Sequence, residues 1–255
     1  MLDPIIEASQ LSVFHFWIAV AVVFFAGMVR GFSGFALSAL IMASLTLVIP
    51  PVELIAVCFM LELTASLMMV RGGFKDGDVG IAGGLTIGSA IGSPIGLYLT
   101  TTLPVDISKL VALLVVLSLA ALQLFRVRAS FLATKPGLYL SGVTAGLATG
   151  LASVGGMVVA LYVLARDAPA ATMRGSLVLF LFMASLFSGG YMWLYGLFTE
   201  AVTVRGMAFI IPCILGVFVG KALFTPRLEP YYKPFCLVLL MVLAGSGIVR
   251  LTIGS

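Results

Sequence analysis

A run of glycine, serine and arginine interrupts the first apolar region of the chain. Residues 27–37 read Gly-Met-Val-Arg-Gly-Phe-Ser-Gly-Phe-Ala-Leu and bring together Arg30, Ser33, Gly34 and Phe35. Glycine weakens a helix interior by roughly 1 kcal/mol relative to alanine, and an arginine at bilayer depth costs at least about 2.5 kcal/mol. A continuous lipid-facing helix gains nothing from either residue. We therefore predict that the helix breaks here and that the break faces an internal polar site.

The chemistry that this stretch favours is the binding of an anion. A helix that begins at such a break presents unpaired N–H groups and the positive end of its dipole. Ser33 adds a hydroxyl donor, and Arg30 adds a fixed charge whose bidentate fork matches a sulfonate or a carboxylate. The alternative is a close-packed helix crossing in which the Arg30 side chain snorkels to the interface.

A second stretch of the same character lies in the other half of the chain. Residues 146–156 read Gly-Leu-Ala-Thr-Gly-Leu-Ala-Ser-Val-Gly-Gly. Hydroxyl donors and close backbone approach at this second break would come from Thr149, Ser153, Gly155 and Gly156. We expect the two breaks to meet near the middle of the bilayer around one shared pocket.

Two further ionisable residues are candidates for the site. Arg174 begins a later apolar segment, where it either holds the anion or marks the cytoplasmic boundary. Glu62 lies in the middle of an apolar segment with Ser66 one turn later, so it could carry a proton that is coupled to anion movement. The alternative for Glu62 is a neutral, hydrogen-bonded carboxyl group that locks two helices together.

Composition places these residues in a membrane protein. Of the 255 residues, 62% are hydrophobic and 9% are charged, whereas soluble domains are roughly 45–50% apolar and about 25% charged. We therefore predict an all-α polytopic membrane protein with eight to ten membrane segments and no sizeable soluble domain. No basic run points to nucleic acid. The three cysteines lack metal-ligand spacing, so we expect neither disulfides, nor a metal site, nor a cofactor.

Ten apolar segments are recognisable along the chain. The seventh is too short to span a bilayer, and the second is similar, so we expect both to be halves of broken or re-entrant helices. The segments cover residues 12–29, 31–49, 52–70, 79–101, 106–125, 136–152, 154–165, 174–195, 201–224 and 234–251.

The basic residues predict the orientation. With the N-terminus outside, one set of connections holds nine basic residues and the other set holds two, Lys109 and Arg205, with Arg250 near the C-terminus. Basic residues favour the cytoplasmic side, so we expect both termini outside and the chain in the cell (inner) membrane. The nine are Arg71, Lys75, Arg126, Arg128, Lys135, Arg166, Arg174, Arg227 and Lys233.

Glycines also indicate an internal repeat. An offset of 124 residues maps Gly92 onto Gly216, and an offset of 119 maps Gly27 onto Gly146. Each half then has five segments, an odd number, so the two halves enter the membrane from opposite sides. We predict two inverted repeats with broken or re-entrant helices, which divide the chain into residues 1–128 and 129–255.

These motifs resemble those of a known family. Arg30-Gly-Phe-Ser-Gly-Phe35 is similar to the first-half signature of the sulfite exporter TauE/SafE family of membrane transporters, and the resemblance extends over essentially the whole chain. Ala36 and Met157 depart from the signatures, at positions where glycine and proline are common. The resemblance implies transport of small sulfur-containing or organic anions such as sulfite, sulfonates or sulfoacetate. The second-half signature comprises residues 146–156, Leu161, Tyr162, Pro169 and Arg174.

The function we expect is therefore secondary transport of a small anion by alternating access. An anion channel and a structural subunit without a site of its own remain alternatives. No GxxxxGK[ST], HExxH or GxSxG motif occurs in the sequence, so neither ATP drive nor an intramembrane enzyme has support. The expected partners are the anion and the lipid bilayer. The exact anion, the direction of transport, the coupling ion and a homodimer are left open.

Overall fold

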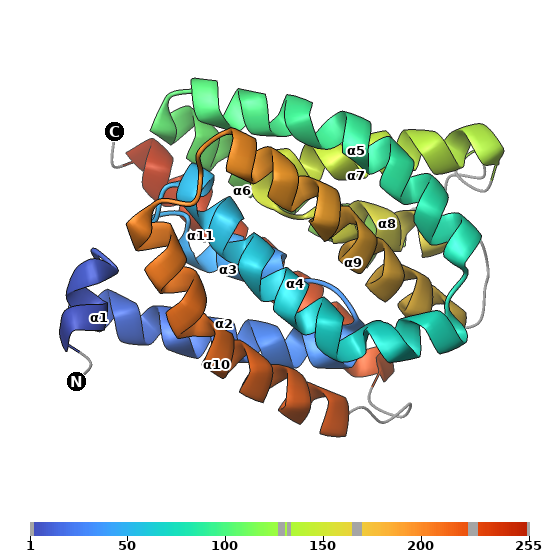
Figure 1. Cartoon of the computed structure of the whole chain (residues 1–255), viewed down its shortest axis with the longest axis horizontal. Coiled ribbons are helices and arrows are strands. Elements are labelled where there is room, and N and C mark those ends of the chain that lie inside the picture. Colours follow the sequence, from blue (N-terminus) through green and yellow to red (C-terminus); the bar gives the residue numbers. More distant parts are fainter. Residues whose placement is uncertain (1–2, 127–130, 132–133, 165–169, 224–228, 254–255) are drawn as a thin grey trace.

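Helices make up the folded part of the chain. The structure is a computed structural model that describes residues 3–126, 131, 134–164, 170–223 and 229–253. Within these residues no strand occurs, which confirms the predicted all-α fold (Figure 1). The helices are α1 (Asp3–Ala8), α2 (Val13–Ser33), α3 (Leu37–Leu45), α4 (Pro51–Asp76), α5 (Val79–Thr102), α6 (Val105–Leu124), α7 (Lys135–Ala152), α8 (Gly155–Leu164), α9 (Ala170–Leu194), α10 (Glu200–Ala222) and α11 (Glu229–Ile253).

Seven of the described helices are long and apolar enough to cross a membrane, namely α2, α4, α5, α6, α9, α10 and α11. A polytopic membrane protein is therefore confirmed. The second and seventh apolar segments give the short helices α3 and α8, with 9 and 10 residues. A bilayer span needs about 20 residues, so neither helix crosses alone, as the sequence predicts.

The first break separates α2 from α3. Gly34 and Ala36 both have positive φ angles, of 83° and 73°. The Ser33 hydroxyl lies 2.8 Å from the carbonyl oxygens of both Val29 and Phe35, so it caps the end of α2 and ties down the turn that follows. The left-handed backbone reverses the chain, and α3 returns toward the end of the bundle where α2 began (Figure 1).

The second break separates α7 from α8. Ser153 takes the left-handed conformation, with φ of 55°, and its N–H donates to the carbonyl oxygen of Thr149. At the end of α7, the carbonyl oxygen of Gly150 accepts from Thr100 near the end of α5. After the break, α8 packs against α7.

Side-chain contacts define the two ends of the bundle. Arg205 at the start of α10 donates to the carbonyl oxygen of Ser9 and pairs with Glu53 at the start of α4. Both chain termini lie at this end (Figure 1). At the opposite end the backbone N–H of Asp78 donates to Ser176. Three basic residues of the predicted orientation, Arg128, Arg166 and Arg227, lie outside the described residues, as does Pro169 of the second-half signature.

Small residues bring two helix pairs into close backbone contact. α5 packs along α7, and α10 packs along α2. A Cβ added at Gly92 would overlap the carbonyl oxygen of Val143, and one added at Gly216 would overlap that of Phe24. Gly216 follows Gly92 by 124 residues, and Val143 follows Phe24 by 119 residues. These are the same offsets that align the two halves of the sequence. Glycine at these positions is therefore required by packing.

The core between these pairs is apolar and includes all three cysteines. Cys58, Cys213 and Cys236 are all buried in this core. Glu62 lies near the middle of α4 and is also buried. A buried carboxylate in such a core needs a partner, and this partner lies on α2.

Candidate anion site at the helix breaks

A buried ion pair lies beside the first break. Arg30, three residues before the end of α2, is 0% exposed, and its Nε atom lies 3.2 Å from Oε2 of Glu62 on α4. Its Nη2 atom donates to Oγ of Ser66 at 2.9 Å. The guanidinium head is thus held inside the protein, and the snorkelling alternative does not describe Arg30 in this structure.

The carboxylate of Glu62 occupies the N-terminus of α3. Its Oε1 atom accepts from the Ser38 hydroxyl at 3.0 Å and from the Ser38 backbone N–H at 3.4 Å. Ser38 is the second residue of α3, where N–H groups have no partner within the helix and the dipole favours a negative charge. The sequence predicts an anion at this break, and the structure holds a carboxylate of the protein itself there.

This network leaves hydrogen-bonding capacity unused. Among the described residues, Arg30 Nη1 has no hydrogen-bond partner, and Glu62 Oε2 faces Arg30 Nε without forming one. A buried donor on a charged group is costly to leave unpaired. The Arg30 head therefore retains capacity for a further acceptor oxygen.

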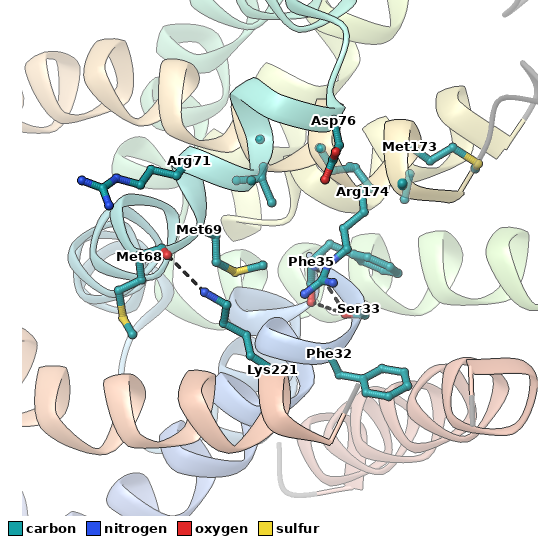
Figure 2. A pocket seen from close by; sticks show the side chains of 17 residues that line it. Phe32, Ser33, Phe35, Met68, Met69, Arg71, Asp76, Met173, Arg174 and Lys221 are labelled. Atoms are coloured by element: carbon teal, nitrogen blue, oxygen red, sulfur yellow. Dashed lines mark hydrogen bonds between the residues drawn. The ribbon is translucent and has the colours of Figure 1, made fainter. Parts of the chain in front are cut away.

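A large cavity opens on the other face of the first break. It has a volume of about 660 Å³ and lies between the break, the second half of α4, the start of α9 and the end of α10 (Figure 2). Its wall is largely apolar, with three cationic residues and one carboxylate. It is lined by Phe32, Ser33, Phe35, Met68, Met69, Arg71, Gly72, Gly73, Asp76, Ala160, Ala171, Met173, Arg174, Gly175, Leu177, Val178 and Lys221.

Arg174 joins the second half of the chain to the first break. Its Nη2 atom donates to the carbonyl oxygen of Gly31, and its side chain extends across the cavity toward Ser33 and Phe35 (Figure 2). A Cβ at Gly34 would lie 2.9 Å from Cγ of Arg174. Glycine at position 34 thus serves two purposes, because it accepts the positive φ and leaves room for the arginine.

A small cavity lies at the second break. Its volume is about 30 Å³, and Thr149, Ser153, Gly155 and Glu62 are among its lining residues. The Thr149 hydroxyl donates to the carbonyl oxygen of Ala145 at 2.8 Å. A Cβ at Gly155 would overlap the Thr149 hydroxyl oxygen.

The structure thus distributes the predicted site residues over two cavities. The larger cavity is lined by Ser33, Phe35 and Arg174, with Gly34 packed against Arg174, and the smaller one is lined by Thr149, Ser153 and Gly155. Arg30 lines neither cavity, and a Cβ on Gly156 would contact Leu181. One shared pocket, as the sequence predicts, is not what this structure has.

Glu62 connects the two breaks. Its Oε1 atom accepts from Ser38 after the first break, and its side chain lines the cavity of the second. The same carboxylate therefore contacts α3 after the first break and the cavity at the second break.

Sequence reasoning missed several lining residues. Arg71 is predicted only as a basic residue of a cytoplasmic connection, and Asp76 and Lys221 are not among the predicted site residues, yet all three line the larger cavity. The Lys221 Nζ atom donates to the carbonyl oxygen of Met68 at 3.3 Å. Ser38 could have been found from its position, because it follows the first break directly. In the described part of the chain, no group of three or more His, Cys, Asp or Glu residues lies together as a metal site would require.

Comparison with known proteins assigns the family. Searches of curated proteins and of solved structures found no match to the chain. A family model described as Sulfite exporter TauE/SafE matches residues 19–247, a range that includes both breaks and every residue of the two cavities. The chain therefore belongs to the sulfite exporter TauE/SafE family of multi-span membrane transporters.

Proposed function

We propose that this protein is a secondary transporter that moves small sulfur-containing or organic anions, such as sulfite or a sulfonate, across the cell inner membrane by alternating access. The observation that carries the proposal is the position of the Glu62 carboxylate. It lies at the N-terminus of α3, beside the charged head of Arg30. These groups can hold an oxyanion in the same way, because sulfite and carboxylate oxygens accept the same donors.

Alternating access is supported by a pair of equivalent packing contacts, each of which joins one half of the chain to the other. The contact of Gly92 with Val143 has a counterpart in that of Gly216 with Phe24, and both are related by the sequence offsets. Two inverted repeats, residues 1–128 and 129–255, would give rise to two such equivalent contacts. Rocking of one half against the other would then open the site to each side in turn.

The state of the cavities favours a transporter over a channel. A channel needs a continuous path, whereas the larger cavity lies at one break and a cavity of about 30 Å³ lies at the other. Arg71, Arg174 and Lys221 line the larger cavity. Because basic residues favour the cytoplasmic side, the proposal places this cavity toward the cytoplasm and both termini outside.

The proposed coupling ion is a proton, which Glu62 would carry. While its carboxylate is charged, it neutralises Arg30 and occupies the end of α3. A proton on Glu62 removes that charge, so an incoming anion becomes the better partner for Arg30. Anion and proton would then be bound together and released together.

The test is uptake of radiolabelled sulfite into proteoliposomes under an imposed pH gradient. Wild-type protein is expected to accumulate sulfite, and Arg30→Ala is expected to lose accumulation while keeping its elution profile in detergent. Arg250→Ala, which removes an exposed cation that lines neither cavity, is the matched control and is expected to transport normally. Normal uptake by Arg30→Ala would remove Arg30 from the mechanism.

A second variant keeps the test decisive if Arg30→Ala fails to fold. Glu62→Gln retains the shape of the side chain but carries no exchangeable charge. We expect this variant to exchange sulfite across the bilayer while the pH gradient no longer drives accumulation. Gradient-driven accumulation at the wild-type level in Glu62→Gln would exclude Glu62 as the proton carrier.

A further inference from the structure

The larger cavity is far bigger than a sulfite ion requires. Sulfite consists of a sulfur atom and three oxygens, whereas the cavity measures about 660 Å³. This volume lies within the range of roughly 300–1,000 Å³ that is typical of sites for drug-sized ligands. Most of its wall carries no polar group that could hold water or a small anion in place.

The apolar part of the wall is continuous with the charged part. Met68 and Met69 on α4 and Leu177 and Val178 on α9 all line the cavity. In Figure 2 the thioether of Met69 lies between the heads of Lys221 and Arg174. Methionine side chains are flexible and polarisable, so they adapt to apolar ligands of differing shape.

The charged residues that line the larger cavity determine which ligands it favours. The lining has three cations, Arg71, Arg174 and Lys221, against one carboxylate, Asp76. An anionic head group is favoured in such a lining, whereas a neutral molecule gains nothing from the charge and a cation is repelled.

We infer that the site takes amphipathic organic anions, with a sulfonate or carboxylate head and an unbranched apolar chain of several carbons, in preference to the inorganic anion. The head group binds at the first break, near Arg174, and the chain lies along Met69, Leu177 and Val178. This inference rests on the proposed function, because it names the class of anion that the transporter takes up in the larger cavity, which adjoins the first break.

The experiment is a thermal-shift titration of the purified protein with a series of linear alkanesulfonates, from methanesulfonate to hexanesulfonate, beside sulfite and the matching 1-alkanols. Each buried methylene is expected to tighten binding by about three- to fourfold. The alkanols are expected to bind much more weakly than the sulfonates of equal length. Affinity that stays constant or falls with chain length would overturn the inference, and so would alkanols that bind as tightly as the sulfonates.

A substitution at the cavity wall localises the effect. Gly72 lines the cavity, and a Cβ built on it meets nothing within 4 Å, so Gly72→Leu adds volume there without disturbing the packing. It is expected to remove the gain in affinity that the longer chains give. Gly190→Leu is the matched control, because Gly190 also has open space but lines neither cavity. Equal responses in the two variants would show that the chains bind elsewhere.

The outcomes separate this inference from the proposed function. Short anions that bind while chain length has no effect contradict only the inference and leave an anion transporter. No binding by sulfite or by any sulfonate contradicts both. A rise in affinity with chain length that Gly72→Leu removes supports both.

Discussion

Arg205 and Glu53 form an ion pair at the end of the bundle where both termini lie, and Arg205 also donates through Nε to the carbonyl oxygen of Ser9 at 2.6 Å. Arg205 is buried, and the Glu53 side chain is about one-third exposed. One guanidinium group thus joins the N-terminal segment, α4 and α10. This end lies opposite the large cavity, so the pair holds these helices together at the end of the bundle away from the cavity.

We predict that Arg205→Ala loosens the N-terminal segment and that Glu53→Gln does not. The alanine variant loses both contacts, whereas the glutamine variant keeps the bond from Arg205 to Ser9. Hydrogen exchange of residues 3–12, measured by mass spectrometry, is expected to accelerate in Arg205→Ala alone. Lys109→Ala is the control, because the pair of Lys109 with Asp106 is on the surface and is worth no more than about 1 kcal/mol. Equal protection in all three variants would contradict the prediction.

The close contact of α5 with α7 gives a prediction about stability. Gly92→Ala forces a methyl group into the carbonyl oxygen of Val143, and overpacking of this kind typically costs about 1–3 kcal/mol. Gly216→Ala, at the equivalent contact of α10 with α2, is expected to lose a similar amount. The free energy of unfolding is measured by titration from mild detergent into sodium dodecyl sulfate.

Gly83→Ala is the matched control for these two variants. Gly83 lies on α5 as Gly92 does, but nothing lies within 4 Å of a Cβ built there. Alanine is the better helix former by roughly 0.5–1 kcal/mol, so Gly83→Ala is expected to stabilise the protein. If Gly92→Ala raised the free energy of unfolding as Gly83→Ala is expected to, this would contradict the close contact between the backbones of α5 and α7.

At the first break, replacing alanine by glycine is expected to stabilise the protein. Ala36 has a φ angle of 73°, and the left-handed conformation costs a residue with a Cβ roughly 1–2 kcal/mol. Glycine removes that cost but adds about 0.5–1 kcal/mol of backbone entropy, so Ala36→Gly is expected to raise the stability slightly. Ala43→Gly in the interior of α3 is expected to lower it. A lower melting temperature for Ala36→Gly than for the wild type would contradict this view of the break.

Local signals explain what the sequence predicted well. Serine and glycine at residues 33–34 and 153–156, each followed by an apolar segment too short to span a bilayer, mark the two breaks. These short segments became α3 and α8. These features depend only on neighbouring residues and on the thickness of the bilayer.

The division into two cavities could not be predicted, because it depends on contacts between distant residues. Glu62 and Arg30 lie on different helices, and no periodicity in the sequence pairs them. Their pairing fills the first break with a carboxylate of the protein itself. The contribution of Lys221 to the large cavity likewise depends on how α10 packs beside α4.

The pair of Arg30 and Glu62 gives the last prediction, which concerns the asymmetry of the two partners. Glu62→Leu leaves a guanidinium group that is 0% exposed and that stays protonated under all ordinary conditions. Removing one partner of a buried pair typically costs about 3–5 kcal/mol. Arg30→Leu leaves a carboxyl group that can take up a proton and become neutral, so it is expected to cost less, and least in acidic buffer.

The double variant Arg30→Leu/Glu62→Leu separates the pair from the packing around it. It leaves no buried charge, so it is expected to be more stable than Glu62→Leu alone, although it carries one more substitution. Ser66→Ala is the control for the loss of a single hydrogen bond and is expected to cost about 1–3 kcal/mol. Thermal unfolding of all four variants in one detergent completes the cycle. Additive losses in the double variant would mean that the 3.2 Å approach of Arg30 to Glu62 contributes no coupling, and the carboxylate would then not be the group that the transported anion has to replace.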